Sequence, residues 1–338
     1  MSDGPDEAYE EYDESSIRVR PNPKANRPRT KQRPEHNNSV TGRVISVDRG
    51  RYGVIVAEGS DEEHRAIATR ARELGRKAIV TGDFVDLVGD TSGVDGSLSR
   101  VVRVQPRTSL LRRSADDTDA VERIIVANAD QMLIVVAAAN PEPRPRLVDR
   151  YLVAAFDAGI TPILVLTKTD LADPTDFLAN FAGLDLRVIR SSTNEFPIEE
   201  LEEILAGHTT VAVGHSGVGK STLVNALVPD ANRAIGRVND VTGRGRHTSS
   251  STISYRIGSG WIVDTPGVRS FGLGHVNPDN ILKSFGDLAE LAEKCPRGCT
   301  HLPDSPDCYL VDREAKGKLG EIGSLRLDSL QRLLETLA

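Results

Sequence analysis

A glycine-rich segment that follows a short apolar run constrains the fold of this chain more than any other feature of its sequence. Residues 211–213 are typical of a buried strand, and the residues after them fit the pattern G-x-x-x-x-G-K-[ST] ahead of a helical stretch. The glycines of such a loop let backbone N–H groups turn toward a phosphate, and the start of the helix adds its positive end. The pattern therefore predicts an α/β sheet with a phosphate-binding loop made of Gly214, His215, Ser216, Gly217, Val218, Gly219, Lys220, Ser221 and Thr222.

Two side chains of this loop and one distant aspartate are predicted to serve the phosphates and a magnesium ion. Lys220 would neutralise the β- and γ-phosphate oxygens, and Ser221 would offer its hydroxyl to Mg²⁺. Asp264 ends the apolar run 261–264 and is followed by Thr-Pro-Gly. Alone, such an aspartate usually marks a plain turn. After a phosphate loop it is expected to hold the Mg²⁺ shell, with the Gly267 N–H on the γ-phosphate.

A tetrad at the end of another apolar run predicts which base the nucleotide carries. The tetrad consists of Thr167, Lys168, Thr169 and Asp170. A carboxylate at Asp170 can accept two N–H bonds from the edge of guanine, and adenine lacks this pair of donors. The aliphatic stem of Lys168 can cover the base, and Thr167 offers a hydroxyl where Asn is common. The predicted ligand is therefore GTP or GDP.

The order of these motifs along the chain is unusual for a guanine-nucleotide fold. In the common order the phosphate loop comes first, whereas here the tetrad precedes it and Asp264 comes last. The segment 189–193, with Ser191 and Ser192 as its candidate site residues, lies where a second base-contacting loop is expected. Strands that alternate with helices indicate a parallel sheet covered on both faces. Residues 113–280 are therefore predicted to form a circularly permuted P-loop GTPase domain, whose switch regions lead directly into the C-terminal region.

A segment rich in glycine and arginine, residues 241–252, is a candidate switch, although a flexible polar loop has the same composition. Thr248 or Ser249 could join the Mg²⁺ shell, and the sequence does not choose between them. Val268 stands where many GTPases place a glutamine that orients water, so slow intrinsic hydrolysis is expected. His247 is the candidate substitute, brought into place by a partner. The predicted catalytic residues are His247, Lys220, Thr248 and Ser249.

All three cysteines of the chain gather with one histidine near the C-terminus. The predicted ligands are Cys295, Cys299, His301 and Cys308. Three clustered cysteines exclude a disulfide framework and are typical of a closed Cys₃His site for one structural Zn²⁺, with a chance grouping as the alternative. Residues 281–338 also show helical periodicity, so they are predicted to form a helical zinc-binding domain.

The N-terminal third divides into a charged tail and a β-rich domain. Residues 1–39 hold an acidic block and then a basic, proline-rich stretch, with too few apolar residues to offset the entropy of ordering. This tail is expected to be disordered, either as a solubilising segment or as a basic arm that settles on phosphates. Residues 40–112 contain five short alternating runs separated by turns, which predicts a small OB-like β-barrel.

Composition limits the environment and the partners of the chain. The net charge is −7, so no uniform basic field is available for nucleic acid. The longest apolar run, residues 132–139, is far shorter than the roughly 18 residues that span a bilayer, and the acidic N-terminus is unlike a secretory signal. We therefore expect a cytoplasmic monomer without a membrane partner. Outside the tail, basic surface is expected at Arg100, Arg103, Arg107, Arg112 and Arg113.

Taken in order, the barrel, the T-K-x-D tetrad, G-H-S-G-V-G-K-S-T, G-R-G-R-H-T, D-T-P-G-V-R-S-F-G and the Cys₃His cluster resemble the ribosome small subunit-dependent GTPase A family over residues 40–338. The resemblance implies a bacterial factor that binds the maturing small (30S) ribosomal subunit late in assembly. It implies GTP hydrolysis stimulated by that subunit, and contacts of the barrel and zinc region with ribosomal RNA. The chain departs from the family at Thr167, in its C-x3-C-x-H-x6-C spacing and in its His-Thr-Ser-Ser switch.

Two other classes of protein share some of these features. In an RNA-binding assembly protein, bound nucleotide would act only as a conformational lock, and Val268 is compatible with that reading. An ATP-dependent kinase or ATPase would use the same phosphate loop but conflicts with Asp170. The intact set of Lys220, Ser221 and Asp264 favours the GTPase.

Overall fold

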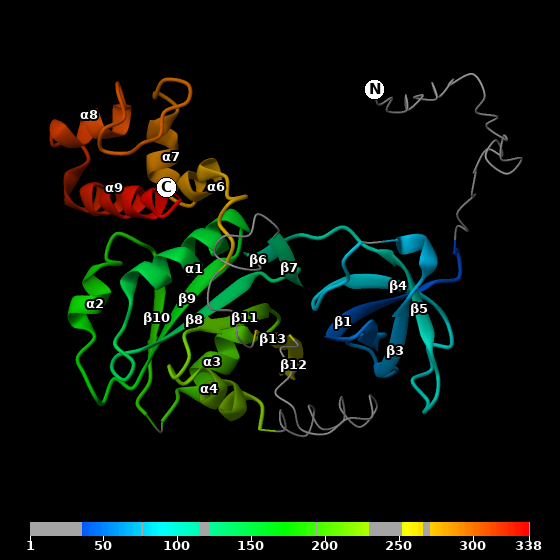
Figure 1. Cartoon of the computed structure of the whole chain (residues 1–338). Helices are drawn as coiled ribbons and strands as arrows, with labels where there is room; N and C mark the ends of the chain where they lie inside the picture. Colours follow the sequence, from blue (N-terminus) through cyan, green and yellow to red (C-terminus); the bar gives the residue numbers. More distant parts are fainter. Residues whose placement is uncertain are drawn as a thin grey trace, which may run out of the picture. The chain divides into compact units, whose positions relative to one another are not determined.

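The computed structural model describes residues 36–75, 77–114, 122–193, 195–229, 252–265 and 271–337 (Figure 1). The predicted tail, apart from its last residues, therefore lies outside the described part of the chain. Within the described part, no helix combines the length and the apolar character that crossing a membrane requires.

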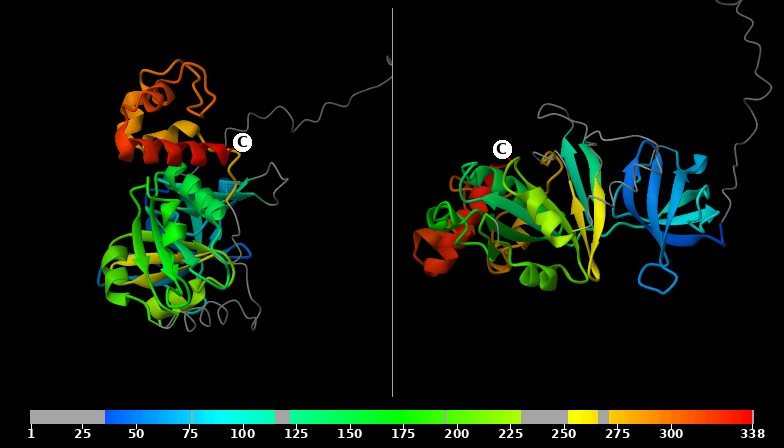
Figure 2. Two further views of the ribbon diagram at one scale, coloured as in Figure 1. Left: turned by 90° about the vertical axis from the view of Figure 1, so that its left-hand side faces the viewer. Right: turned by 90° about the horizontal axis from the view of Figure 1, so that it is seen from below.

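Five short strands form a closed barrel near the N-terminus, drawn in blue and cyan in Figures 1 and 2. They are β1 (Val40–Asp48), β2 (Arg51–Val56), β3 (His64–Arg70), β4 (Phe84–Gly89) and β5 (Ser99–Val104), with a 3₁₀ turn, η2 (Arg72–Leu74), after β3. The ring runs β1–β2–β3–β5–β4 and closes because β4 also pairs with β1. Its interior is filled by buried alternate residues such as Val54, Leu87 and Val101. The predicted barrel is confirmed.

The arginines of the barrel supply less basic surface than their number suggests. Arg107 is only 12% exposed and donates to both carboxylate oxygens of the fully buried Asp83, at 2.6 and 2.8 Å. This pairing neutralises both charges inside the domain, so the expectation that Arg107 adds to a basic surface is wrong. Arg103 remains 61% exposed, although it lies 3.2 Å from Asp86.

A two-stranded hairpin follows the barrel. It pairs β6 (Leu110–Ser114) with β7 (Glu122–Ala127). The domain boundary predicted between residues 112 and 113 falls inside β6, and the domain limits stay a prediction.

The central sheet has the order β10–β9–β8–β11–β13–β12, and only β12 runs antiparallel to its neighbour. The strands are β8 (Gln131–Ala137), β9 (Thr161–Thr167), β10 (Arg187–Arg190), β11 (Thr209–Gly214), β12 (Ile253–Ile257) and β13 (Gly260–Asp264). Their continuous apolar runs suit strands with both faces covered. Parallel β8, β9, β11 and β13 thus end at one edge of the sheet, where the phosphate loop begins.

Helices cover both faces of this sheet (Figures 1 and 2). On one face, Met132 and Ile134 of β8 pack in the same cluster as α1 (Pro145–Asp157). On the other, Leu133 and Val135 pack with the helices α3 (Ile198–Leu205) and α4 (Lys220–Leu227). Alternate side chains of β8 therefore point to opposite faces of the sheet and contribute to the cores on both. A short helix, α2 (Thr175–Ala179), follows β9.

The C-terminal region is helical, as predicted. It consists of α6 (Pro278–Lys283), α7 (Gly286–Ala292), α8 (Tyr309–Ala315) and α9 (Gly320–Glu335). Buried leucines of α9, including Leu327, Leu330 and Leu333, belong to the same cluster as the α1 face of the sheet. The cysteine-containing loop connects α7 to α8. The whole therefore matches the predicted class of barrel, α/β domain and helical C-terminal region.

Candidate nucleotide site and metal centre

The phosphate loop connects β11 to α4, and its backbone accounts for its glycines. An added Cβ at Gly214 would lie 2.6 Å from the carbonyl oxygen of Val135, which leaves no room for a side chain. Gly217 and Gly219 have φ values of +84° and +92°, a conformation that favours glycine. The helix starts directly at Lys220, so its free N–H groups lie beside the loop. This is the arrangement that binds a phosphate.

The parallel register brings the phosphate lysine and the strand-end aspartate together. Asp264 pairs with Ala212 across β13 and β11, and the ammonium of Lys220 contacts the Asp264 carboxylate. Thr265 fixes the end of β13, because its hydroxyl donates to the Ala212 carbonyl at 3.0 Å. A cationic group, a carboxylate and the exposed Ser221 hydroxyl thus lie where a phosphate and a divalent cation could share ligands.

A cavity of about 610 Å³ joins these groups to Thr167 and Lys168 of the tetrad, whereas Thr169 and Asp170 are not among its lining residues. Its size falls within the roughly 300–1,000 Å³ of sites for small organic ligands and cofactors. The lining residues are Thr167, Lys168, Thr193, Phe196, Gly214, His215, Ser216, Gly217, Gly219, Lys220, Ser221, Thr222 and Asp264. Most of the residues predicted for nucleotide binding therefore surround one cavity.

The tetrad is attached to the phosphate loop by two side chains. Lys168, with φ +57°, donates its ammonium to the Gly217 carbonyl at 2.9 Å and also contacts the Asn140 carbonyl. The hydroxyl of Thr167 donates to the Val218 carbonyl at 2.6 Å. Lys168 thus stretches along the cavity wall, in the position from which its stem could cover a base.

Asp170, the predicted guanine acceptor, is held by Thr193. The Thr193 N–H donates to one carboxylate oxygen at 2.6 Å, and its hydroxyl lies 3.0 and 2.9 Å from the two oxygens. Partial desolvation raises the pKa of Asp170, but these hydrogen bonds outweigh it and hold the pKa below its ordinary value. The carboxyl group is therefore ionised at neutral pH, as an acceptor of N–H bonds must be.

The segment predicted to form a second base-contacting loop lies against the tetrad through its backbone. The Ser191 carbonyl accepts from both the N–H and the hydroxyl of Thr169, at 3.1 and 3.0 Å. The Ser192 N–H donates to the Glu195 carbonyl at 3.1 Å, and the Ser192 carbonyl accepts from the Ser191 hydroxyl at 3.1 Å. Among the described contacts, Asp170 is hydrogen-bonded by the next residue, Thr193, and not by Ser191 or Ser192.

Two contributors to this site, Phe196 and Asn140, were not selected from the sequence, whereas Thr193 is the last residue of the segment 189–193 that was expected to form a second base-contacting loop. Asn140 follows β8 in an Asn-Pro pair, which marks a turn at the sheet edge and was an available signal. His247, Thr248, Ser249 and Gly267 lie outside the described residues, so their predicted roles are not tested.

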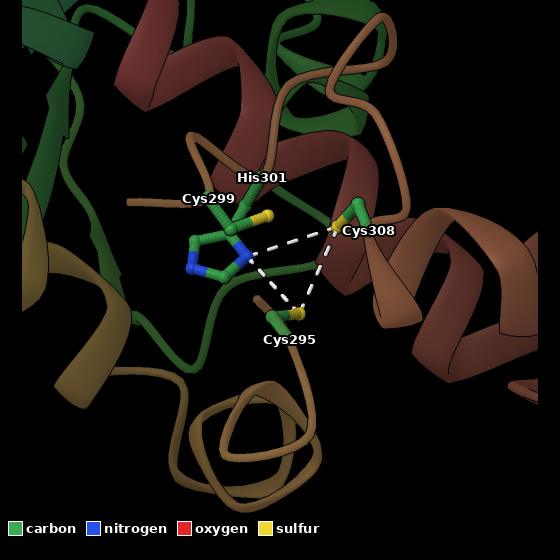
Figure 3. A group of neighbouring side chains, drawn as sticks. All are labelled: Cys295, Cys299, His301 and Cys308. Carbon is green, nitrogen blue, oxygen red and sulfur yellow. Dashed lines mark hydrogen bonds between the residues drawn. The ribbon is translucent and has the colours of Figure 1, made fainter. Parts of the chain in front are cut away.

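The Cys₃His cluster converges in the loop between α7 and α8 (Figure 3). The four ligand atoms lie within 4.8 Å of one another. The Cys295 sulfur is 3.6 Å from His301 Nδ1 and 3.9 Å from the Cys308 sulfur, and the latter is 3.8 Å from the same nitrogen. A tetrahedral Zn²⁺ with its usual bond lengths separates such ligands by about 3.6–3.8 Å. The donor set and the spacing therefore fit structural zinc.

Two further residues support the ligands of this centre. The Ser305 hydroxyl lies 3.3 Å from the Cys299 sulfur, and Gln331 of α9 donates its amide to the His301 carbonyl at 3.0 Å. His301 has φ +58°, so the Gln331 contact helps to hold an unusual backbone conformation.

Comparison with known proteins places this arrangement in a family. The sequence model of the RsgA GTPase matches residues 104–274. The small ribosomal subunit biogenesis GTPase RsgA of Pseudomonas aeruginosa PAO1 is 37% identical over 293 residues, covering 82% of this chain and 81% of that protein. The protein of the same name from Chromohalobacter salexigens is 37% identical over 298 residues, with 85% and 84% covered.

The chain belongs to the RsgA GTPase family. Among solved structures, YjeQ from Thermotoga maritima matches with a TM-score of 0.64 and 25% identity, over 88% of this chain and 98% of that one. YloQ, described as a circularly permuted GTPase, has the same fold, with a TM-score of 0.63, 22% identity, and 90% and 96% covered. The predicted family, the permuted GTPase fold, the guanine nucleotide and GTP hydrolysis are thereby confirmed.

For an RsgA GTPase, the site geometry explains how the permuted order still builds one pocket. Strand β9, which ends at the predicted base-reading tetrad, lies beside β8, and β11, which leads into the phosphate loop, lies on the other side of β8. Lys168 and Thr167 bridge from β9 to that loop. Adjacency in the sheet, not order in the chain, therefore assembles the site.

Proposed function

We propose that this RsgA GTPase acts in the biogenesis of the small (30S) ribosomal subunit, with the subunit and its ribosomal RNA as partners and stimulators of hydrolysis. The observation that supports the proposal is the cavity lined by the phosphate loop, by Asp264 and by Thr167 and Lys168 of the tetrad. The chain is also 37% identical to relatives named for that process. The proposal takes the protein as a cytoplasmic monomer.

The proposed roles of the site residues follow from their charge and position. Lys220 and the loop N–H groups bind the β- and γ-phosphates, while Asp170 accepts the N–H donors of guanine. Ser221 and Asp264 hold Mg²⁺, which when bound neutralises charge that develops on the phosphates. His247 positions the attacking water once the subunit is bound, because Val268 cannot.

The barrel and the zinc-bearing loop are the proposed contacts to ribosomal RNA. Arg103 of the barrel, which is 61% exposed and also contacts Asp86, is a proposed phosphate contact, whereas Arg107 is paired with the buried Asp83. The Cys₃His cluster would hold a Zn²⁺ ion, which would keep the loop in one conformation as closed tetrahedral sites do.

The proposal is tested by GTP turnover of the full chain alone, with purified small subunits and with purified large subunits. Strong stimulation by small subunits only is expected. The Lys220→Ala variant should lose turnover in all three mixtures, which controls for contaminating GTPases. Equal turnover with both subunits would contradict the proposal. Slow turnover in every mixture, with subunit binding that depends on nucleotide, would favour an RNA-binding protein that uses the nucleotide as a conformational lock.

A further inference from the structure

The Thr167 hydroxyl occupies the position where many guanine-nucleotide proteins have an asparagine amide. Thr167 ends β9, lines the cavity and is only 2% exposed. Its Oγ1 lies 2.6 Å from the carbonyl oxygen of Val218 in the phosphate loop and 3.4 Å from that of Val136 in β8. Both neighbours are therefore backbone acceptors on elements that flank the nucleotide cavity.

A hydroxyl has one proton to donate, whereas an asparagine amide has two. Carbonyl oxygens only accept, so the Thr167 proton is committed to the Val218 carbonyl at the shorter distance. The N7 and O6 atoms of guanine are also acceptors. No proton is left on Thr167 for the edge of the base while this hydrogen bond exists.

The surrounding backbone makes the Thr167–Val218 bond hard to exchange. Val218 is 3% exposed, so its carbonyl would be left without a partner if the hydroxyl turned away. A Cβ placed on Gly219 would lie 3.6 Å from the Thr167 hydroxyl, which shows how closely the loop passes over this side chain. The hydroxyl is therefore enclosed between β9 and the phosphate loop.

We infer that Thr167 is a positioning residue, which holds the phosphate loop against the base-reading strand and does not read the base. Selection of guanine then rests on Asp170, whose carboxylate contacts the opposite edge of the ring system from N7. The inference rests on the guanine-nucleotide site described above and adds that the N7 atom is not recognised through this side chain. It predicts that removing the Thr167 hydroxyl lowers the affinity for all nucleotides by the same factor.

The test compares GDP with 7-deaza-GDP, which lacks the N7 acceptor, by calorimetric titration of the full chain. Wild type is expected to bind both equally, within about twofold. Thr167→Val keeps the shape of the side chain. It should lower the affinity for both nucleotides by about tenfold, because one buried hydrogen bond is lost and a carbonyl is left unpaired. Thr167→Ser retains the hydroxyl and should bind both like wild type. Thr161→Val, at the exposed start of the same strand, is the matched control and should bind like wild type.

Two results would overturn the inference. One is a clear preference of wild type for GDP over 7-deaza-GDP that disappears in Thr167→Val, since the hydroxyl would then read N7. The other is wild-type affinity of Thr167→Val for both nucleotides. Thr167→Val could melt too far below Thr161→Val for titration. The affinities of wild type and Thr167→Ser then provide the test. Equal affinity for GDP and 7-deaza-GDP supports the inference, and a preference for GDP refutes it. Failure of wild type to bind GDP at all would instead remove the nucleotide site itself.

Discussion

Asp170 and Thr193 show how a single carboxylate can be prepared for one base. Thr193 donates its N–H and lies with its hydroxyl against both oxygens, so the plane of the carboxylate is set before a ligand arrives. An ionised carboxylate has about four acceptor positions, which leaves room for the two N–H donors of guanine. If Asp170 reads the base as proposed, the specificity of the site depends on the charge of this carboxylate and on its orientation.

Asp170→Asn should reverse the base preference. Xanthine carries a C2 carbonyl where guanine carries an amino group, and the asparagine amide can donate to it. We expect GDP affinity to fall by about 100-fold through the loss of charge-assisted hydrogen bonds, and affinity for xanthosine diphosphate to rise. Fluorescence titration measures both. Asp173→Asn, an exposed change three residues along the chain, should leave the preference intact; an unchanged preference in Asp170→Asn would disprove base reading by this residue.

His247→Ala should separate nucleotide binding from stimulated hydrolysis. If His247 positions water only when the small subunit is bound, the variant keeps GTP affinity and loses most of the stimulated turnover. Turnover assays with and without subunits measure this, and His208→Ala, an exposed histidine at the far end of the β11 strand, is the control. Stimulated turnover at the wild-type level would remove His247 from the mechanism.

Between elements, a buried ion pair joins α1 to α9. Asp149 of α1 is fully buried, and the Arg332 guanidinium of α9 lies 3.2 Å from it. Burial raises the pKa of Asp149, and the nearby arginines Arg332 and Arg146 oppose this. Arg332 also contacts the Asn180 carbonyl and stacks 5.2 Å from the Phe181 ring. One side chain thereby connects the C-terminal helix to the segment after the tetrad.

Removal of the Arg332 charge should be costly, because it leaves a buried carboxylate without its partner. We expect Arg332→Met to lower the free energy of unfolding by about 3 kcal/mol. On the same helix, Arg326 pairs with the 51% exposed Asp287, and Arg326→Met should cost less than about 1 kcal/mol. Urea unfolding of both variants measures the difference. Equal losses would show that the pair between α1 and α9 contributes no more than a surface pair.

At the scale of the whole molecule, the described part of the C-terminal region that holds the Cys₃His cluster shares a core with one face of the central sheet. Cys308 and Leu310 belong to the cluster that includes α1, whereas the phosphate loop residue Val218 and helix α4 belong to the opposite face. Loss of zinc should therefore affect stability more than nucleotide affinity.

Purified protein is expected to hold one equivalent of zinc, measured by elemental analysis. Cys299→Ser should lose the metal and melt at a lower temperature, because the loop between α7 and α8 loses its cross-link. GDP affinity at a temperature below that transition should stay close to wild type. Ser324→Ala, at a half-buried position of α9 whose hydroxyl donates to Glu314 and Gly320 and not to a ligand of the cluster, is a control that should retain zinc. Full zinc content in Cys299→Ser would show that this cysteine is not a ligand.

Features encoded in contiguous residues were predictable from the sequence. The phosphate loop and the Cys₃His cluster each lie within a short stretch, so the local backbone alone places their ligands near one another. The alternation of strands and helices, and the order of the motifs, likewise indicated the permuted α/β domain. In these features the interacting residues are close together in the sequence, so a sequence pattern is enough to predict them.

Only the tertiary structure decided which distant groups meet. Thr193 lies 23 residues from Asp170, and Lys168 reaches the Asn140 carbonyl across 28 residues. Arg107 looked like free basic surface until the barrel closed and placed it on Asp83. A side chain's charge and hydrogen-bonding groups are fixed by its type, but their partners are selected by which surfaces fold together. For the same reason Thr167 could be predicted from the sequence as a nucleotide-site residue, whereas the hydrogen bond from its hydroxyl to the phosphate loop is visible only in the tertiary structure.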